Sequence, residues 1–207
     1  MVAANTASWV APIAAAGATR FILQLESFSN NNANNGNAND NDDNIRTSTS
    51  TTSDGYVSST MSTVTRNNIL KTAHLIRQSG MACGICIKPS TPISTIESLL
   101  LESWTDGSPL FELVDILAVN PGFAGQKFNP EVLEKVKYLV STPSLRKAVK
   151  YVAVDGGINE STIQEAVAAG ANIIVAGSAA FGPNRCVSQG YKPVLERVQK
   201  LVHLIQD

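Results

Sequence analysis

Short apolar runs alternate with longer amphipathic stretches along most of the chain. The apolar runs are nearly continuous, as expected for parallel strands covered on both faces, and they lie at 21–25, 82–87, 114–119, 151–154 and 172–176. Helical spacing of apolar residues predicts helices over 6–16, 67–78, 129–140, 160–169 and 191–205. Gly17, Gly80 and Gly170 stand where helix C-caps are expected. The alternation of strand and helix predicts an α/β fold with a parallel sheet.

The count of predicted strands leaves two architectures open. About five strands are three fewer than an eight-stranded barrel needs, whereas an open doubly wound sheet needs no more. The hydrophobic pattern alone does not choose between them.

The stretch 29–65 breaks this alternation. It consists mainly of Asn, Ser, Thr and Asp and has almost no apolar side chains to bury. Such a composition does not offset the entropy of ordering, so we expect a disordered surface insertion. It separates a first part of the domain, 1–28, from its continuation, 66–207.

Composition and charge exclude several classes of function. The 207 residues, of which 43% are hydrophobic, suffice for one domain with a core. A formal net charge of -1 provides no basic field for nucleic acid, and no apolar run reaches the roughly 20 residues of a membrane span. The first residues have the pattern of neither a signal peptide nor a transit peptide. We expect no nucleic-acid partner and no membrane partner.

Cys83 and Cys86 form a C-x-x-C motif inside a predicted strand. Residues three apart in a strand point to opposite faces, so the two sulfurs should diverge rather than act as a redox pair or half a zinc site. We expect a structural role for both and a reducing compartment.

Three glycine-rich loops follow predicted strands, at 120–127, 155–158 and 177–182. Active sites of parallel α/β folds lie at these strand ends, where glycine lets backbone N–H groups approach a ligand. Each glycine taken alone could serve only a tight turn. The three loops in succession favour phosphate binding.

Asp155 ends an apolar run and precedes two glycines. Its carboxylate should therefore project into the mouth of the site. The alternative role is a helix cap, but Asn159 and Ser161 are better placed for that.

Three motifs carry a resemblance to a known family. Asn120-Pro-Gly-Phe-Ala-Gly-Gln-Lys-Phe128, Val154-Asp-Gly-Gly-Ile158 and Val175-Ala-Gly-Ser-Ala179 resemble, in order and spacing, the ribulose-phosphate 3-epimerase family. Weaker likeness over 1–28 and 84–89 extends the resemblance to nearly everything but the insertion. The resemblance implies a (β/α)8 TIM barrel, here represented by its fourth to eighth strands. It also implies interconversion of D-ribulose 5-phosphate and D-xylulose 5-phosphate, in the pentose phosphate pathway or the Calvin cycle.

The resemblance assigns roles to individual residues. Asp155 corresponds to a catalytic acid/base that is also a ligand of a divalent metal ion of the Zn, Fe, Mn or Co type. The positions that correspond to substrate and phosphate binding are Gly122, Phe123, Ala124, Gly125, Gly156, Gly157, Ile158, Gly177 and Ser178. The implied partner is a small phosphorylated sugar, a homo-oligomer stays open, and the expected location is the cytoplasm, or a plastid if a transit peptide precedes this sequence.

The departures from the family pattern are as informative as the matches. The family's first strands carry a serine, a His-x-Asp motif and a ligand histidine that have no counterpart here. His74 and His203 fall within predicted helices, where packing or surface roles are expected. Gln24 replaces a histidine, Leu117 a methionine and Ala124 a glycine.

These departures leave alternatives open. The sequence is either a piece of an epimerase or an inactive relative that binds a phosphorylated ligand or a partner. A third alternative is another phosphate-binding barrel, such as an enzyme of tryptophan biosynthesis.

Overall fold

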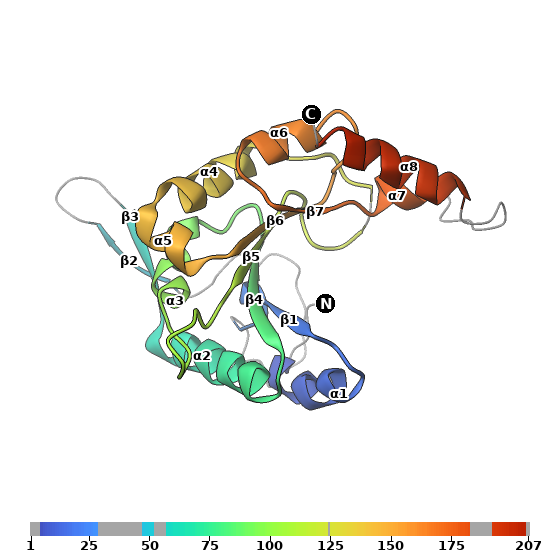
Figure 1. The fold of residues 1–207 in the computed structure, drawn as a ribbon. Coiled ribbons are helices and arrows are strands. Elements are labelled where there is room, and N and C mark those ends of the chain that lie inside the picture. The colour runs from blue at the N-terminus through green and yellow to red at the C-terminus, as the bar shows by residue number, and fades with distance from the viewer. Residues whose placement is uncertain (1–4, 29–46, 52–56, 124, 183–191, 206–207) are drawn as a thin grey trace, which may run out of the picture. The chain divides into compact units, whose positions relative to one another are not determined.

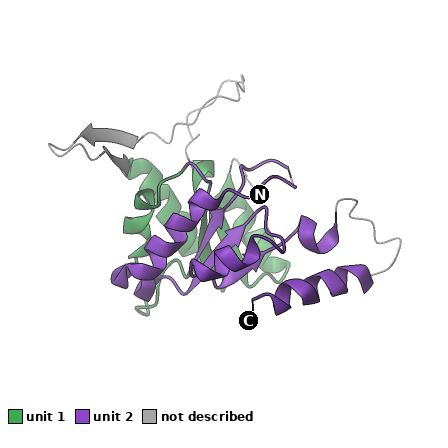
Figure 2. Cartoon of the chain, turned by 90° about the horizontal axis from the view of Figure 1, so that it is seen from above, with its two compact units in different colours: residues 1–87, 91–112 green, residues 88–90, 113–207 purple. Residues whose placement is uncertain are grey.

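The structure is a computed structural model that describes residues 5–28, 47–51, 57–123, 125–182 and 192–205. It consists of two compact units, which Figure 2 draws in different colours. Unit 1 comprises Met1–Ile87 and Thr91–Glu112, and unit 2 comprises Lys88–Ser90 and Leu113–Asp207.

Unit 1 is built on two parallel strands, β1 (Arg20–Gln24) and β4 (Ala82–Ile87), which pair from Arg20↔Ala82 to Gln24↔Cys86. Its other elements, labelled in Figure 1 where there is room, are η1 (Thr6–Trp9), α1 (Val10–Ala15), η2 (Leu25–Phe28), β2 (Thr47–Thr51), β3 (Val57–Met61), α2 (Thr63–Gln78), η3 (Ile93–Thr95) and α3 (Glu97–Leu100). β2 and β3 form a separate antiparallel pair.

Helix α2 shows how local sequence sets the bounds of an element. The Ser62 hydroxyl accepts a hydrogen bond from the Thr65 backbone N–H at 3.1 Å, which caps the helix and places its start four residues before the predicted one. Ile69, Ala73 and Ile76 are buried on one face. The helix ends before Gly80, whose φ of 79° is the conformation expected of a C-cap glycine.

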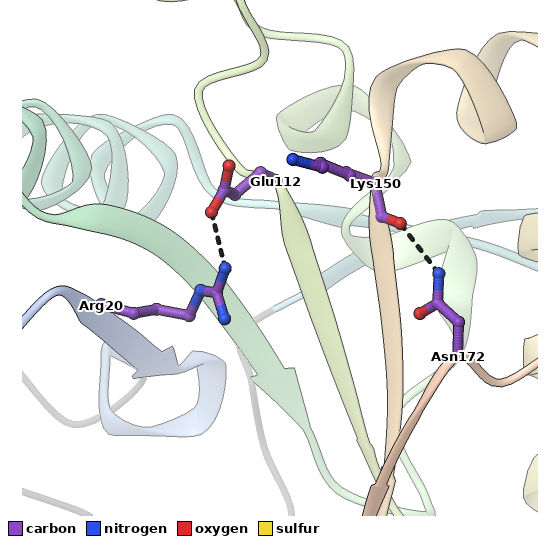
Figure 3. A network of polar contacts seen from close by, with 4 residues as sticks. All are labelled: Arg20, Glu112, Lys150 and Asn172. Atoms are coloured by element: carbon purple, nitrogen blue, oxygen red, sulfur yellow. Dashed lines mark hydrogen bonds and ion pairs between the residues drawn. The ribbon is translucent and has the colours of Figure 1, made fainter.

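An ion pair links the start of β1 to Glu112, the last residue of unit 1. The Arg20 guanidinium lies 2.9 Å from the Glu112 carboxylate, with side-chain exposures of 34% and 22% (Figure 3). Partial exposure limits such a pair to roughly 1 kcal/mol.

Unit 2 contains three parallel strands in the order β5 (Leu113–Leu117), β6 (Tyr151–Asp155) and β7 (Ile173–Val175). Its other elements are η4 (Pro130–Val132), α4 (Leu133–Ser141), α5 (Pro143–Ala148), α6 (Ile163–Ala168), α7 (Ser178–Phe181) and α8 (Lys192–His203). Helices follow strands in regular alternation (Figure 1).

Asn172 closes the start of the β6–β7 pairing with both atoms of its side-chain amide. Its Nδ2 donates to the Lys150 carbonyl at 3.0 Å, as Figure 3 shows, and its Oδ1 accepts from the Val152 N–H at 2.8 Å. Its own N–H donates to the Val152 carbonyl at 3.0 Å. The side chain thus adds two hydrogen bonds to a strand only three residues long.

All five predicted strands and the five predicted helices are confirmed; the strand over 82–87 coincides with β4, and the other elements have shifted ends. The predicted helix over 6–16 begins as the 3-10 turn η1, and the one over 160–169 is confined to α6. The short helices α3, α5 and α7 were not predicted. Of the predicted insertion, 29–46 and 52–56 lie outside the described residues, whereas β2, β3 and the start of α2 fall within it.

The cysteine and histidine predictions concern side chains that the structure describes. Cys83 and Cys86 are both buried thiols in β4. Burial raises the pKa of the Cys83 thiol, with the nearby Glu112 acting in the same direction and Arg77 against it. His74 packs against Trp104 with ring centroids 5.3 Å apart, and His203 is exposed at the end of α8. Over the described ranges, no helix combines the length and the apolar character required to cross a membrane.

Candidate active site

Asp155 is the last residue of β6, at the carboxyl end of the sheet in unit 2. It lies in register with Leu117 of β5 and Val175 of β7, so the three side chains share one face of the sheet. The backbone carbonyl of Asp155 accepts a hydrogen bond from the Ala118 N–H at 2.7 Å, which fixes the strand end beside the loop after β5. The predicted position of Asp155 at a strand end is confirmed.

The Asp155 carboxylate is half-buried, and within the described ranges no charged group or hydrogen-bond donor compensates it. Burial alone raises the pKa of this carboxyl above its ordinary value, because desolvation disfavours the charged form. A carboxylate that is partly dehydrated and unpaired is a stronger base than a solvated one. Such a group is a candidate for proton transfer.

The loop from Asn120 to Phe128 is closed at its base and braced across its middle. The Asn129 N–H donates to the Ala118 carbonyl at 2.9 Å, which closes the base. The Gln126 side-chain amide donates to the carbonyls of Asn120 and Phe123, at 2.6 and 2.9 Å. These hydrogen bonds tie the described residues of the loop to one another at the end of β5.

Phe123 and the loop glycines are accessible to solvent. The Phe123 side chain is 74% exposed, and Gly122 and Gly125 are exposed with φ values of 151° and 87°. Side chains rarely adopt this region of φ, so the backbone conformation itself favours glycine. The exposed backbone at these positions is open to a ligand.

The two glycines after Asp155 pack directly on this loop. A Cβ on Gly157 would lie 2.5 Å from both the N and Cα atoms of Phe128, and a Cβ on Gly156 would collide with the Val119 side chain. Their φ values are 107° for Gly156 and 67° for Gly157. Only glycine allows this approach, which brings the loops after β5 and β6 together.

The turn that carries these glycines is anchored to the start of α6. Asn159 Nδ2 and the Thr162 hydroxyl donate to the Gly157 carbonyl at 3.1 and 3.2 Å. The Asn159 side-chain oxygen accepts from the Ser161 N–H at 2.8 Å, so Asn159 organises this turn. The predicted capping role of Asn159 or Ser161 is wrong, because the N-cap of α6 is Thr162 and no side chain caps the helix. The Ile158 side chain is buried, which leaves its backbone as the part that a ligand can reach.

The third predicted loop begins just beyond β7. Gly177 and Ser178 are exposed, and they follow Val175, the register partner of Asp155, by two and three residues. The structure therefore places the three loops at the same edge of one parallel sheet. Ala124 lies outside the described residues.

Metal binding was predicted for Asp155, and the described residues do not fit a complete metal site. Within the described ranges, no three His, Cys, Asp or Glu side chains form a group that could hold a metal ion. Gln24, which the resemblance aligns with a family histidine, donates to the Glu26 carboxylate. Among the described residues, Asp155 is therefore a metal-ligand candidate without the further ligands that a metal site needs.

Val119, Gln126 and Phe128 were missed as supporting residues of the site. Val119 and Phe128 form the surface on which Gly156 and Gly157 pack, and Gln126 braces the loop. Each acts through contacts that depend on the folded path of the loop. No spacing rule in the sequence could have identified them.

Comparison with known proteins gives a consistent family. The family model described as "Ribulose-phosphate 3 epimerase family" matches residues 53–181. The ribulose-phosphate 3-epimerase of Mycobacterium bovis is 38% identical over 128 residues, 62% of this chain and 52% of that protein. The cytoplasmic isoform from Oryza sativa is 42% identical over 120 residues, 58% of this chain and 48% of that protein. The Bacillus subtilis enzyme is 37% identical over 113 residues, 54% of this chain and 48% of that protein.

The chain thus spans about half the length of the curated relatives it matches. The matched range includes every predicted site residue, whereas the predicted resemblance over 1–28 lies outside it. The family's fold is a (β/α)8 barrel, and five parallel strands in alternation with helices are consistent with part of one. On the match over 53–181, together with the strand-end loops that fall within it, the chain belongs to the ribulose-phosphate 3-epimerase family.

Proposed function

We propose that this chain contributes the phosphate-binding loops and one acid/base carboxylate of a ribulose-phosphate 3-epimerase. The substrate class is a pentulose 5-phosphate, D-ribulose 5-phosphate or D-xylulose 5-phosphate. The observation that carries the proposal is Asp155, a half-buried carboxylate that no described residue compensates, beside two loops that pack on each other. It is supported by the family to which the chain belongs.

The chemistry required is the removal and return of one proton. The C3 hydrogen of the sugar is acidic because C2 is a ketone, so its removal leaves an enediolate. The Asp155 carboxylate accepts this proton, becomes a neutral carboxyl group and returns the proton to C3 on the same face. Inversion at C3 needs a second acid/base group on the opposite face, which Asp155 cannot supply.

The raised pKa of Asp155 suits this role. A base whose pKa lies closer to the working pH takes up a proton more readily while still being ionised in part. Burial is the cause, so a bound substrate that excludes more water would act in the same direction.

The glycine loops are proposed to hold the phosphate. Exposed backbone at Gly122, Gly125 and Gly177 offers N–H groups to phosphate oxygens, and the Ser178 hydroxyl adds a further donor. Phe123 and Ala124 complete the first loop, and Gly156, Gly157 and Ile158 complete the second. We propose all of them as substrate-binding positions.

A divalent metal of the Zn, Fe, Mn or Co type belongs to the proposed complete enzyme, with Asp155 as one ligand. The described residues of this chain do not form its site, so no step above depends on it. We further propose a cytoplasmic or plastid location and a role in the pentose phosphate pathway or the Calvin cycle.

The test is proton exchange at C3 in D₂O, followed by NMR, with D-ribulose 5-phosphate and the purified chain. We expect binding of the sugar phosphate and C3 exchange that depends on Asp155, without formation of the epimer. Asp155→Asn should abolish exchange, whereas Asp106→Asn, an exposed aspartate of unit 1, should not. Epimer formation at an ordinary enzymatic rate, with or without added divalent metal, would contradict the proposal that this chain supplies only one of the two acid/base groups.

A second candidate function is that of an inactive relative that binds a phosphorylated ligand. Asp155 is the single carboxylate that the described residues bring to the site, which favours this candidate because two-faced proton transfer needs two such groups. The same experiment separates the two candidates. Binding of the sugar phosphate without exchange identifies the inactive relative, and absence of binding refutes both.

A further inference from the structure

Unit 1 contains a cavity of about 270 Å³ that is separate from the candidate active site. Its walls come from three elements that pack together, because η1 and η2 both contact α2. The residues that line it are Asn5, Thr6, Ala7, Ser27, Phe28, Asn68, Lys71 and Thr72. All of them belong to unit 1, whereas Asp155 and the three glycine loops belong to unit 2.

Hydrogen bonds within unit 1 hold the walls of this cavity. The Thr6 and Ser27 hydroxyl oxygens lie 3.1 Å apart in a hydrogen bond that ties η1 to η2. The Ser27 hydroxyl donates to the Gln24 carbonyl at 2.7 Å, so it accepts the bond from Thr6. On α2, the Thr72 hydroxyl is buried and donates to the Asn68 carbonyl at 2.9 Å. The walls are therefore shaped by the chain's own contacts.

Three other polar side chains of the lining have no such partner within the described ranges. Asn5 stands at the N-cap of η1, but its side chain makes no capping hydrogen bond. The Asn68 side-chain amide and the Lys71 ammonium likewise have no hydrogen bond or ion pair with a described residue. Asn68 is half-buried, and it lies inside α2, where asparagine is a poor helix former. Two amides and one ammonium group are thus available to a ligand.

The cavity carries a positive charge that described acidic groups do not neutralise. Lys71 is the one charged residue of the lining. Glu102 is paired with Arg66, which lies earlier on α2. Glu26, next to Ser27, accepts hydrogen bonds from Gln24 and Thr91 instead. An anionic group is therefore the natural partner of the Lys71 ammonium, because a charge-assisted hydrogen bond is stronger than a neutral one.

The remaining lining indicates the size and the character of the ligand. A side-chain amide both donates and accepts, so Asn5 and Asn68 match hydroxyl groups. Phe28, 7% exposed, and Ala7 offer an apolar surface to a short carbon skeleton. Since one water occupies about 30 Å³ of liquid, the cavity has room for roughly nine non-hydrogen atoms.

We propose that this cavity is a binding site for a small hydroxylated anion, a phosphate monoester or a carboxylate of about this size. The Lys71 ammonium binds the anionic group, the amides of Asn5 and Asn68 bind hydroxyl groups, and Phe28 contacts the carbon skeleton. The inference rests on the contacts of unit 1 and is independent of the proposed catalytic role of Asp155.

The experiment is residue-resolved NMR of the ¹⁵N-labelled 207-residue chain, titrated separately with glycerol 3-phosphate, glycerate and glycerol. Glycerol 3-phosphate, with about ten non-hydrogen atoms, has the size of the cavity. We expect shifts of the Asn5 and Asn68 side-chain amide signals, with a dissociation constant on the order of 1 mM for at least one anion. The tighter of the two anions identifies the anionic group. Neutral glycerol should bind at least about 10-fold more weakly, because it has no charge to pair with Lys71.

Two variants and a matched control test the assigned roles. Lys71→Met should weaken binding of the anion by at least about 10-fold, because it removes the ammonium. Lys137→Met removes the same charge from an exposed site of α4 in unit 2 and should leave the dissociation constant within about twofold. Asn68→Ala should weaken binding by about 2- to 10-fold. Since alanine is the better helix former, this second variant keeps α2 folded, as circular dichroism can verify.

Four outcomes would overturn the proposal. The first is that neither anion shifts the signals of the cavity residues. The second is that glycerol binds as tightly as the anions, and the third is that folded Lys71→Met binds like the parent. The fourth is that shifts are confined to the glycine loops at 120–127, 155–158 and 177–182, because the anion would then occupy the candidate active site alone. None of these outcomes bears on whether Asp155 exchanges a proton.

Discussion

Gly157 is the position at which the site depends most directly on backbone geometry. Its φ of 67° is unfavourable for most other residues, and a Cβ would lie 2.5 Å from the N and Cα atoms of Phe128. These are backbone atoms, so no rotation of a side chain relieves the contact. We therefore expect Gly157→Ala to displace the loop after β5 or the turn after β6.

The magnitude follows from two costs. A side chain in the left-handed region costs about 1–2 kcal/mol, and forced overpacking adds about 1–3 kcal/mol. Gly157→Ala should therefore lower the free energy of unfolding by roughly 2–5 kcal/mol. For a chain of this size, each kcal/mol corresponds to roughly 2–4 °C in melting temperature.

Two other glycines of the site provide controls that separate the costs. Gly125 has a φ of 87° but open space around its Cβ position, so Gly125→Ala should cost only the first term, about 1–2 kcal/mol. Gly177 has a φ of -83° and open space, so Gly177→Ala should be neutral or stabilising by up to about 1 kcal/mol.

The assay is urea unfolding of the three variants, followed by circular dichroism. The expected order of stability is Gly177→Ala, then Gly125→Ala, then Gly157→Ala. If Gly157→Ala is no less stable than Gly125→Ala, the close packing of the two loops is refuted. Binding of D-ribulose 5-phosphate should be weakened most in the same variant, because its loops are displaced.

Further predictions concern Asp155, Ser178, Ser62 and Cys83. Because the native pKa of Asp155 is raised, its native carboxyl holds its proton more tightly than the unfolded one, and its stabilising contribution is lost as pH rises through the native pKa. Asp155→Asn should therefore melt higher than the parent at neutral pH, with a difference that shrinks as pH falls toward 3.8; a constant difference contradicts this. In a complete epimerase barrel that contains these residues, Asp155→Asn should lower kcat by about 10²- to 10⁴-fold, whereas Ser178→Ala should mainly raise KM, since backbone donors remain. Replacing 29–61 with a short linker should leave the melting temperature unchanged, but Ser62→Ala should cost about 1 kcal/mol by removing the cap of α2. Cys83 should react with a thiol reagent only on unfolding, as mass spectrometry can measure, because burial keeps it protonated.

The parts of the fold that the sequence predicts are those with long, regular patterns. The run 82–87 coincides with β4, because buried parallel strands need apolar residues on both faces. Helices α5 and α7 were missed because six and four residues are too few to show a helical period. Pro143 at the first position of α5 was the one available signal.

The candidate site also has a part that the sequence predicts and a part that it does not. Asp155 and the glycines were predictable because strand ends in parallel sheets meet at one edge, whatever the details of the loops. The roles of Gln126 and Phe128 were not predictable, because they depend on how the loop curves back toward β6. Glycine in a loop indicates a close approach of the backbone to another group, but it does not identify that group.

The Asn172 side chain has a consequence for how this sequence tolerates mutation. Its amide imitates a peptide group, with a donor and an acceptor that face Lys150 and Val152. Aspartate at this position would set a carboxylate against the Lys150 carbonyl, serine has no second polar atom, and glutamine is one carbon too long. Among homologous sequences, the residue at position 172 should therefore vary far less than its exposed location suggests. Its conservation would reflect these backbone hydrogen bonds and not a catalytic role.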